Sequence, residues 1–81
     1  MRVRIKVSKI QKQFGYQVRK LRQEKPWTQD ECAEICGLNR SHMGEIERGE
    51  VDVRLSTIEI IAQALGTTVS SLFKDIATKT L

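Results

Sequence analysis

Three side chains between Asn39 and Gly49 combine strong hydrogen-bond donors with acceptors: Arg40, Ser41 and Glu45. Arginine can donate two parallel hydrogen bonds to guanine, serine can donate or accept one, and glutamate can accept from the amino group of cytosine. Glutamate is costly near phosphates unless it is paired, so a base contact by Glu45 should discriminate strongly. The chemistry that these side chains offer is recognition of base edges.

A helical segment would place these side chains on one face. At about 100° per residue, with Arg40 at zero, Met43 lies near 300° and Ile46 near 240°, so the buried direction is about 270°. The outward face is polar, and a short helix of this kind fits the major groove of DNA. The predicted base contacts are the residues on that face or at its margins: Arg40, Ser41, His42, Gly44 and Glu45.

Gly44 would sit in the interior of this helix, where glycine costs about 1 kcal/mol relative to alanine. One interpretation is that the missing side chain lets the helix approach base edges or a thymine methyl closely. The other is a tolerated surface glycine. The residues leave both interpretations open.

Local signals define the two helices on either side of the bend. Thr28 and Glu31 form a T-x-x-E capping box that begins a helix at Gln29, and Gly37 ends it. Asn39 is a good N-cap for the next helix, which ends at Gly49. A connection of only three residues with glycine first is typical of a helix-turn-helix unit.

The remaining helices must supply the core, because two short helices cannot be stable alone. A first helix is predicted from Val7 to about Lys25, since Pro26 interferes with its continuation. Its apolar face comprises Val7, Ile10, Phe14, Val18 and Leu21.

Two further helices follow. Ser56 and Glu59 suggest a second capping box, and Gly66 ends the helix that it opens. Thr68 can cap a fifth helix. The apolar positions predicted to face inward in the fourth helix are Ile58, Ile61, Ala62 and Leu65. In the fifth helix the three-four spacing is repeated by Val69, Leu72, Phe73 and Ile76. The sequence therefore predicts an all-α fold of five helices.

Length and composition limit the alternatives. The 81 residues suffice for one domain, and the net charge of +4 suits a polyanionic partner without proving one. Cys32 and Cys36 are the only cysteines and His42 the only histidine, too few ligands for zinc. Buried, reduced thiols are therefore expected, with no cofactor or metal. No membrane span or signal peptide is apparent, which predicts a cytoplasmic protein.

An enzyme is disfavoured by the same residues. The sequence has no glycine-rich phosphate loop, no paired carboxylates in a pocket and no organised Cys–His pair. A core of this size also leaves little room for a cleft, so no small-molecule substrate is expected.

The stretch from 18 to 73 resembles the Cro/lambda-repressor-like (XRE) helix-turn-helix family, over about two thirds of the chain. Four blocks carry the resemblance: VRKLRQEK at 18–25, TQDECA at 28–33, GLNRSHMGEIERG at 37–49 and IIAQALGTTVSSLF at 60–73. The resemblance implies a compact five-helix DNA-binding domain that works as a transcription regulator on double-stranded DNA.

The family also implies roles for single residues. Gln29 corresponds to a glutamine that holds a phosphate and braces the recognition helix, and Thr28 with the neighbouring amides would bind a second phosphate. Glu47 and Arg22 correspond to a buried ion pair. Arg48 and Arg54 correspond to phosphate contacts, with solvated surface charges as the alternative.

Two departures from the family pattern stand out. Cys32 replaces a usual leucine and is expected to be a smaller core residue. Residues 1–8 form a basic extension before the predicted domain at 9–76, and 77–81 form a tail. The extension is predicted to enter the minor groove as an arm, to pair as a strand across a dimer, or to be disordered.

A regulator of this size is expected to act as a dimer on a palindromic operator, because one recognition helix reads few base pairs. The predicted dimer interface comprises Ile60, Val69 and Leu72. Restriction-modification controller proteins and Cro-type repressors that control their own operon are the most similar subfamilies. An antitoxin-like protein-interaction module is the alternative. Glu31 and Glu34 are candidates for contact with RNA polymerase, although a solvated acidic face is the simpler interpretation.

Overall fold

The computed structural model describes residues 8–74, which form five helices and no strand. Helix α1 runs Ser8–Glu24, α2 Gln29–Cys36, α3 Arg40–Arg48, α4 Leu55–Ala64 and α5 Val69–Leu72. The predicted all-α architecture is confirmed, including both bounds of the two helices at the bend. Within these bounds no helix is long and apolar enough to cross a membrane.

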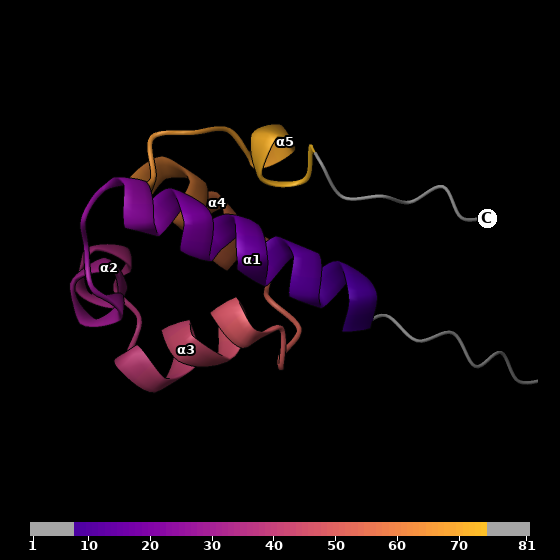
Figure 1. Cartoon of the computed structure of the whole chain (residues 1–81), viewed down its shortest axis with the longest axis horizontal. Coiled ribbons are helices and arrows are strands. Elements are labelled where there is room, and N and C mark those ends of the chain that lie inside the picture. Colours follow the sequence, from indigo (N-terminus) through magenta and orange to yellow (C-terminus); the bar gives the residue numbers. More distant parts are fainter. Residues whose placement is uncertain (1–7, 75–81) are drawn as a thin grey trace, which may run out of the picture.

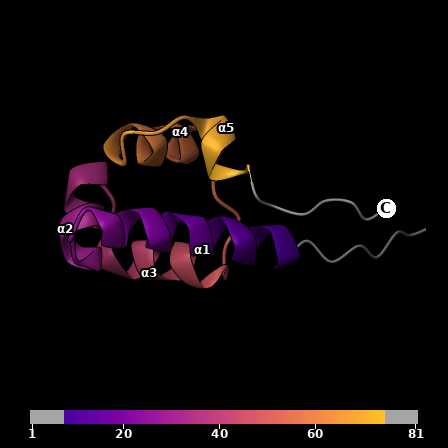
Figure 2. The same cartoon turned by 45° about the horizontal axis from the view of Figure 1, so that its top comes forward.

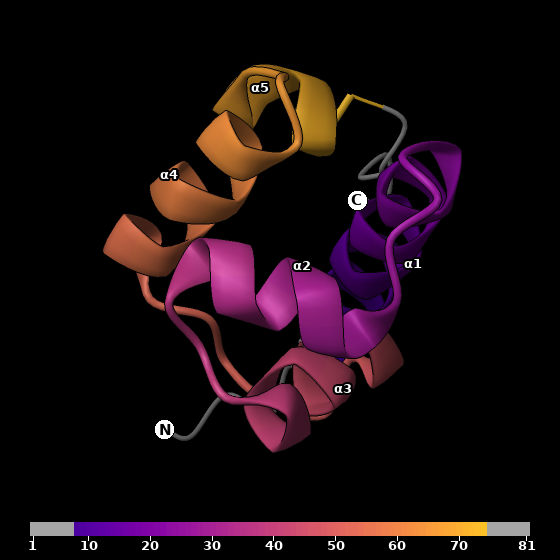
Figure 3. The same ribbon diagram turned by 90° about the vertical axis from the view of Figure 1, so that its left-hand side faces the viewer.

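Helix α1 is the longest element and divides the molecule. In Figure 1, α3 lies on one side of α1, and α4 with α5 lies on the other. Figure 2 shows the same separation after rotation, with α4 and α5 together above α1. The end-on view in Figure 3 shows α2 between α3 and the α4–α5 pair. Helix α2 therefore bridges the two halves.

The core lies where the apolar faces of the helices meet. Met43 and Ile46 of α3 are buried there, as their spacing predicts, and the Phe14 and Phe73 rings stack with centroids 5.1 Å apart. The stacked rings tie α1 to the residue after α5. The buried hydrophobic residues are Phe14, Val18, Cys32, Ala33, Cys36, Met43, Ile46, Ile58, Ile61, Ala62, Leu65 and Leu72.

Two predictions about the elements need correction. Ile10 is 42% exposed, because it lies near the start of α1 beyond most of the residues that cover Phe14 and Val18. The Ser56–Glu59 capping box is wrong: α4 begins at Leu55 with Arg54 as N-cap, and no side chain caps it. Ser56 is therefore already inside the first turn.

Part of the predicted domain division lies outside the described residues. Ser8, assigned to the basic extension, is the first residue of α1. Residues 1–7, and with them Val7, are outside the described range, as are Ile76 and the predicted tail at 77–81.

Candidate nucleic-acid interface

The bend between α2 and α3 is built by local hydrogen bonds. Thr28 Oγ1 accepts from the Glu31 backbone N–H at 3.1 Å, and Glu31 Oε1 accepts from the Thr28 N–H at 2.8 Å, so the predicted capping box is present. Gly37 has φ 73° and ψ 26°, a left-handed conformation that glycine adopts without strain. Asn39 Oδ1 then accepts from the His42 N–H at 2.8 Å and starts α3. These signals fix the angle at which α3 leaves α2.

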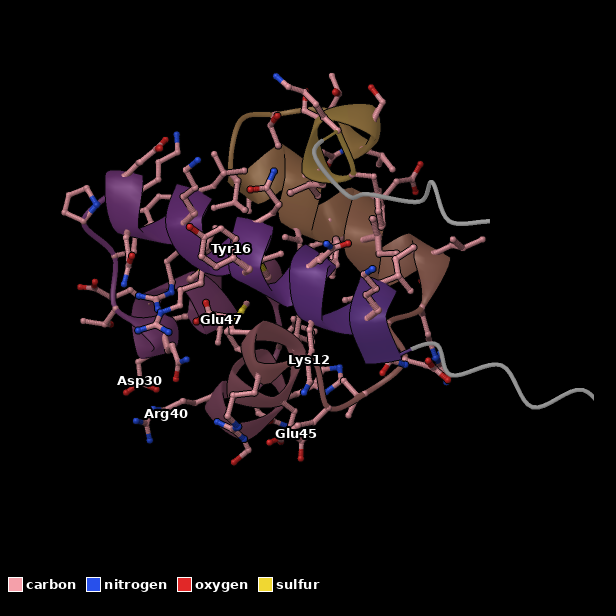
Figure 4. All side chains as sticks on the ribbon, turned by 45° about the vertical axis from the view of Figure 1, so that its right-hand side comes forward. Lys12, Tyr16, Asp30, Arg40, Glu45 and Glu47 are labelled. Atoms are coloured by element: carbon pink, nitrogen blue, oxygen red, sulfur yellow. The ribbon has the colours of Figure 1, made fainter. Side chains whose placement is uncertain are left out.

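A shallow depression runs along the outward face of α3. We call its lining the recognition surface; it comprises Gln29, Arg40, Ser41, Gly44, Glu45 and Arg48. Figure 4 shows the side chains of Arg40 and Glu45 at the outer edge of the molecule, whereas Glu47 lies between α3 and α1. The structure therefore places Arg40, Ser41 and Glu45 together on one solvent-facing surface, with the buried Gly44 at its floor, whereas His42 does not line it.

Two exposed side-chain contacts lie at this surface. Arg40 Nε lies 3.6 Å from Asp30 Oδ1 at the start of α2 and forms an ion pair with it, and His42 Nδ1 lies 3.5 Å from Glu45 Oε1, a contact that is ionic only when the imidazole is protonated. Figure 4 shows Asp30 and Arg40 side by side. Pairs this exposed contribute little to stability. Their side chains can therefore exchange these partners for base or phosphate groups.

A third exposed pair was missed by the sequence analysis. Arg48 Nε donates to Glu50 Oε2 at 3.0 Å. This hydrogen bond raises the pKa of Arg48 and lowers the pKa of Glu50 from their ordinary values. The pair therefore holds at neutral pH and is lost only as the pH falls through the lowered pKa of Glu50. The sequence E-R-G-E at 47–50 could have predicted this pair, because a glutamate two residues after an arginine lies within reach of its guanidinium.

A buried network holds α3 against α1. Arg22 Nε and Nη2 donate to the two carboxylate oxygens of Glu47 at 2.6 and 2.9 Å, which confirms the predicted ion pair. The hydrogen bond to Glu47 raises the pKa of Arg22. Arg22 Nη1 also donates to the Trp27 carbonyl at 2.8 Å.

Gln29 joins the same network. Its Nε2 donates to Glu47 Oε1 at 2.9 Å, so the bracing role implied by the family resemblance matches the geometry. The first residue of α2 is thereby connected to the last turn of α3. Its phosphate contact stays a prediction.

Helices α1 and α3 also approach each other through glycine. A Cβ on Gly15 would lie 2.4 Å from the Ile46 carbonyl oxygen and 2.5 Å from that of Glu47. A Cβ on Gly49 would lie 2.6 Å from Lys12 Cα. Sequence analysis gave Gly15 no role, although a glycine in the middle of a long helix is itself a signal of close packing.

The thiols of α2 behave as core residues. Cys32 and Cys36 are free and buried, as predicted. The hydrogen bond that the Cys32 thiol donates to Cys36, together with burial, raises the pKa of Cys32 far above its ordinary value, so this thiol is protonated at neutral pH. Among the described residues, no cluster of three or more His, Cys, Asp or Glu side chains could hold a metal ion.

The predicted dimer surface is only partly exposed. Ile60 and Val69 are 43% and 38% exposed, but Leu72 is fully buried in the core and cannot contact a partner. Leu72 points inward because its helix has only one turn, which packs against α4 and α1. Sequence reasoning missed Leu55, which is 83% exposed beside Val69 and Phe73.

Comparison with known proteins identifies the class of this fold. Residues 13–72 match a family described as a helix-turn-helix domain. The chain is 40% identical over 68 residues to the control protein C.MunI of Mycoplasma sp., covering 83% of this chain and 92% of C.MunI. It is 46% identical over 55 residues to the control protein C.SmaI of Serratia marcescens, covering 68% of this chain and 66% of that protein.

A solved structure agrees with these relatives. The restriction-modification controller protein C.AhdI from Aeromonas hydrophila aligns with a TM-score of 0.78 and 36% identity, over 82% of this chain and 96% of C.AhdI. The chain spans only 50% of another curated relative, a hypothetical transcription factor of Neisseria meningitidis serogroup B, at 42% identity over 53 residues. The chain belongs to the Cro/lambda-repressor-like helix-turn-helix family, a family of DNA-binding transcription regulators and not of enzymes.

Proposed function

We propose that this protein is a sequence-specific regulator that binds double-stranded DNA as a dimer on a palindromic operator and controls its own operon. The observation that carries the proposal is the recognition surface: Arg40, Ser41 and Glu45 face solvent together on a helix braced from behind by Arg22 and Glu47. The similarity to restriction-modification controller proteins supports this type of regulator.

The proposed division of labour follows from position. Arg40, Ser41, His42 and Glu45 read base edges from the exposed face of α3. Thr28, Gln29, Arg48 and Arg54 contact phosphates on either side of it. Arg54 supports this assignment because it is the N-cap residue of α4, and no side chain caps the first amides of this helix, which leaves them free to donate to a phosphate.

Dimerisation would double the length of DNA that is read. Two copies related by a two-fold axis place recognition helices about 34 Å apart, one turn of the duplex. Ile60 and Val69, together with Leu55, offer apolar area for that contact on α4 and α5. On α2, Glu31 and Glu34 are exposed and are the candidate contacts for RNA polymerase; Glu31 already accepts the Thr28 N–H.

A mobility-shift assay against the DNA upstream of the protein's own gene tests the proposal. We expect a retarded complex that an unrelated duplex of equal length does not displace. Binding to every duplex without sequence preference would refute the proposal that the protein is a sequence-specific regulator.

Arg40→Ala should weaken binding to the cognate site by about 1–3 kcal/mol and relax the base preference at one position. Arg54→Ala should instead weaken binding to all sequences alike and reduce the slope of log affinity against log salt by about one. Affinities measured on a panel of single-base variants at several salt concentrations separate the two effects. Equal losses for both variants on every duplex would show that α3 does not read the bases.

Ile60→Glu should shift the protein from dimer toward monomer, because it places a charge in an apolar contact. Sedimentation velocity across a range of protein concentrations measures the shift. Glu59→Gln, at a neighbouring exposed position of α4, is the matched control and should leave the profile unchanged. A dimer that survives Ile60→Glu would place the interface elsewhere.

A further inference from the structure

Gly44 does not face open solvent as the sequence suggests. It is buried, and a Cβ at this position would lie 3.0 Å from Arg48 Nη1 and 3.6 Å from Gln29 Oε1. The guanidinium of Arg48 is therefore folded back over the middle of α3. A contact of 3.0 Å is tighter than nearly all real Cβ contacts, so an alanine would displace the end of the Arg48 side chain.

Glu50 restrains Arg48 from the opposite side. Its carboxylate accepts a hydrogen bond from Nε at 3.0 Å, which leaves Nη1 to lie over Gly44. Both side chains are exposed, so the pair adds little to the stability of the fold. What the pair fixes is the direction of a long side chain that would otherwise sample many rotamers.

Gln29, the other side chain that lies close to Gly44, is held in place. Gln29 cannot swing away freely, because its Nε2 donates to Glu47, which Arg22 holds in turn. Arg48 is thus held at Nε by Glu50 and lies over the bare helix at Gly44, beside which Gln29 is fixed. The surface on which it lies is the recognition surface.

We propose that Gly44 and Glu50 are positioning residues that hold the Arg48 guanidinium ready for its contact with the DNA backbone. This inference rests on the proposed function, because it specifies how one phosphate contact is prepared. A side chain that is ordered before binding loses less conformational entropy on contact. Glu50 therefore increases the affinity for a polyanion, although its own charge is negative.

The direction in which one substitution changes the affinity for DNA distinguishes positioning of Arg48 from simple electrostatic attraction. Glu50→Gln removes a negative charge from the interface, so electrostatic attraction alone predicts tighter binding. Positioning predicts binding that is weaker by about two- to tenfold, the cost of ordering one long side chain. Glu24→Gln, which removes an exposed charge at the end of α1 where no arginine pairs with it among the described residues, is the matched control and should leave binding equal or slightly tighter.

Gly44→Ala tests the steric half of the proposal and should also weaken binding by about two- to tenfold. Both effects must act through Arg48. In an Arg48→Ala background, Glu50→Gln and Gly44→Ala should therefore change the affinity by less than about twofold. Dissociation constants of the wild type, the single and double variants of the two cycles and the control, measured by fluorescence anisotropy with an operator duplex, give the result.

Tighter binding by Glu50→Gln, or losses that persist in the Arg48→Ala background, would overturn the proposal. A second measurement needs no DNA: the Arg48 Nε–H signal in nitrogen-15 spectra of the free protein should be resolved and slowly exchanging in the wild type and not in Glu50→Gln. Equal exchange in both proteins would likewise overturn it. Failure of the wild type to bind any duplex would refute the proposed function separately, while the exchange measurement still decides whether Glu50 orders Arg48.

Discussion

Replacing Glu47 with alanine should lower the free energy of unfolding by about 3–5 kcal/mol, because it leaves a buried guanidinium without its partner. Arg22 donates through Nε and Nη2 to this one carboxylate, and Gln29 donates to it as well. Small domains have about 5–15 kcal/mol of stability in total. The variant should therefore be close to unfolding at room temperature, which urea denaturation followed by circular dichroism will measure.

Two further variants serve as a control and as a rescue of the Glu47→Ala variant. Glu50→Ala removes the carboxylate of an exposed pair on the same protein and should leave the denaturation midpoint unchanged. The double replacement Arg22→Met with Glu47→Leu should recover most of the stability, since apolar side chains of similar volume often replace a buried pair without loss. If Glu47→Ala unfolds at the wild-type urea concentration, water must reach Arg22, and the network does not hold α3 in place.

Gly15→Ala should destabilise the fold by about 1–3 kcal/mol, the usual cost of overpacking. Alanine in a helix interior normally gains about 1 kcal/mol over glycine, so the expected sign is the reverse of the ordinary one. The reason is that its Cβ would meet the backbone oxygens of Ile46 and Glu47, at 2.4 and 2.5 Å, and backbone cannot turn aside as a side chain can. Thermal and urea unfolding measure the effect.

Gly44→Ala provides the internal comparison for Gly15→Ala. It is also a helical glycine, but its new Cβ would meet only the end of the flexible Arg48 side chain. We expect it to be neutral for folding or to stabilise the protein by up to about 1 kcal/mol. Similar gains in stability for both alanines would show that α1 can move away from α3 without cost.

The elements at the bend could be predicted because their signals are local. Thr28, Gly37 and Asn39 each satisfy backbone groups within four residues of themselves, and the structure contains all three as predicted. The inward positions of Met43 and Ile46 follow from helical periodicity for the same reason. The buried pair of Arg22 and Glu47 came instead from the family resemblance, since nothing local links residues 25 positions apart.

The remaining features depend on contacts between distant residues. The start of α4 at Leu55 is decided by how the chain leaves α3, although Ser56 and Glu59 offer a better local cap. Leu72 belongs to the core because the one turn of α5 packs against α1 and α4 on the side that carries it, whereas Val69 at the start of the same turn stays partly exposed. Gly15 has a role only once α3 lies across it.

The separation between what anchors α3 and what faces outward has a practical consequence. Among the described residues, no hydrogen bond or ion pair joins Arg40, Ser41 or Glu45 to the Arg22–Glu47–Gln29 network, and the partners of Arg40 and Glu45 are exposed or half-exposed. Their side chains can therefore be exchanged without repacking the interior. Libraries randomised at these three positions should yield folded proteins with new operator preferences, which makes this chain a suitable scaffold for retargeting.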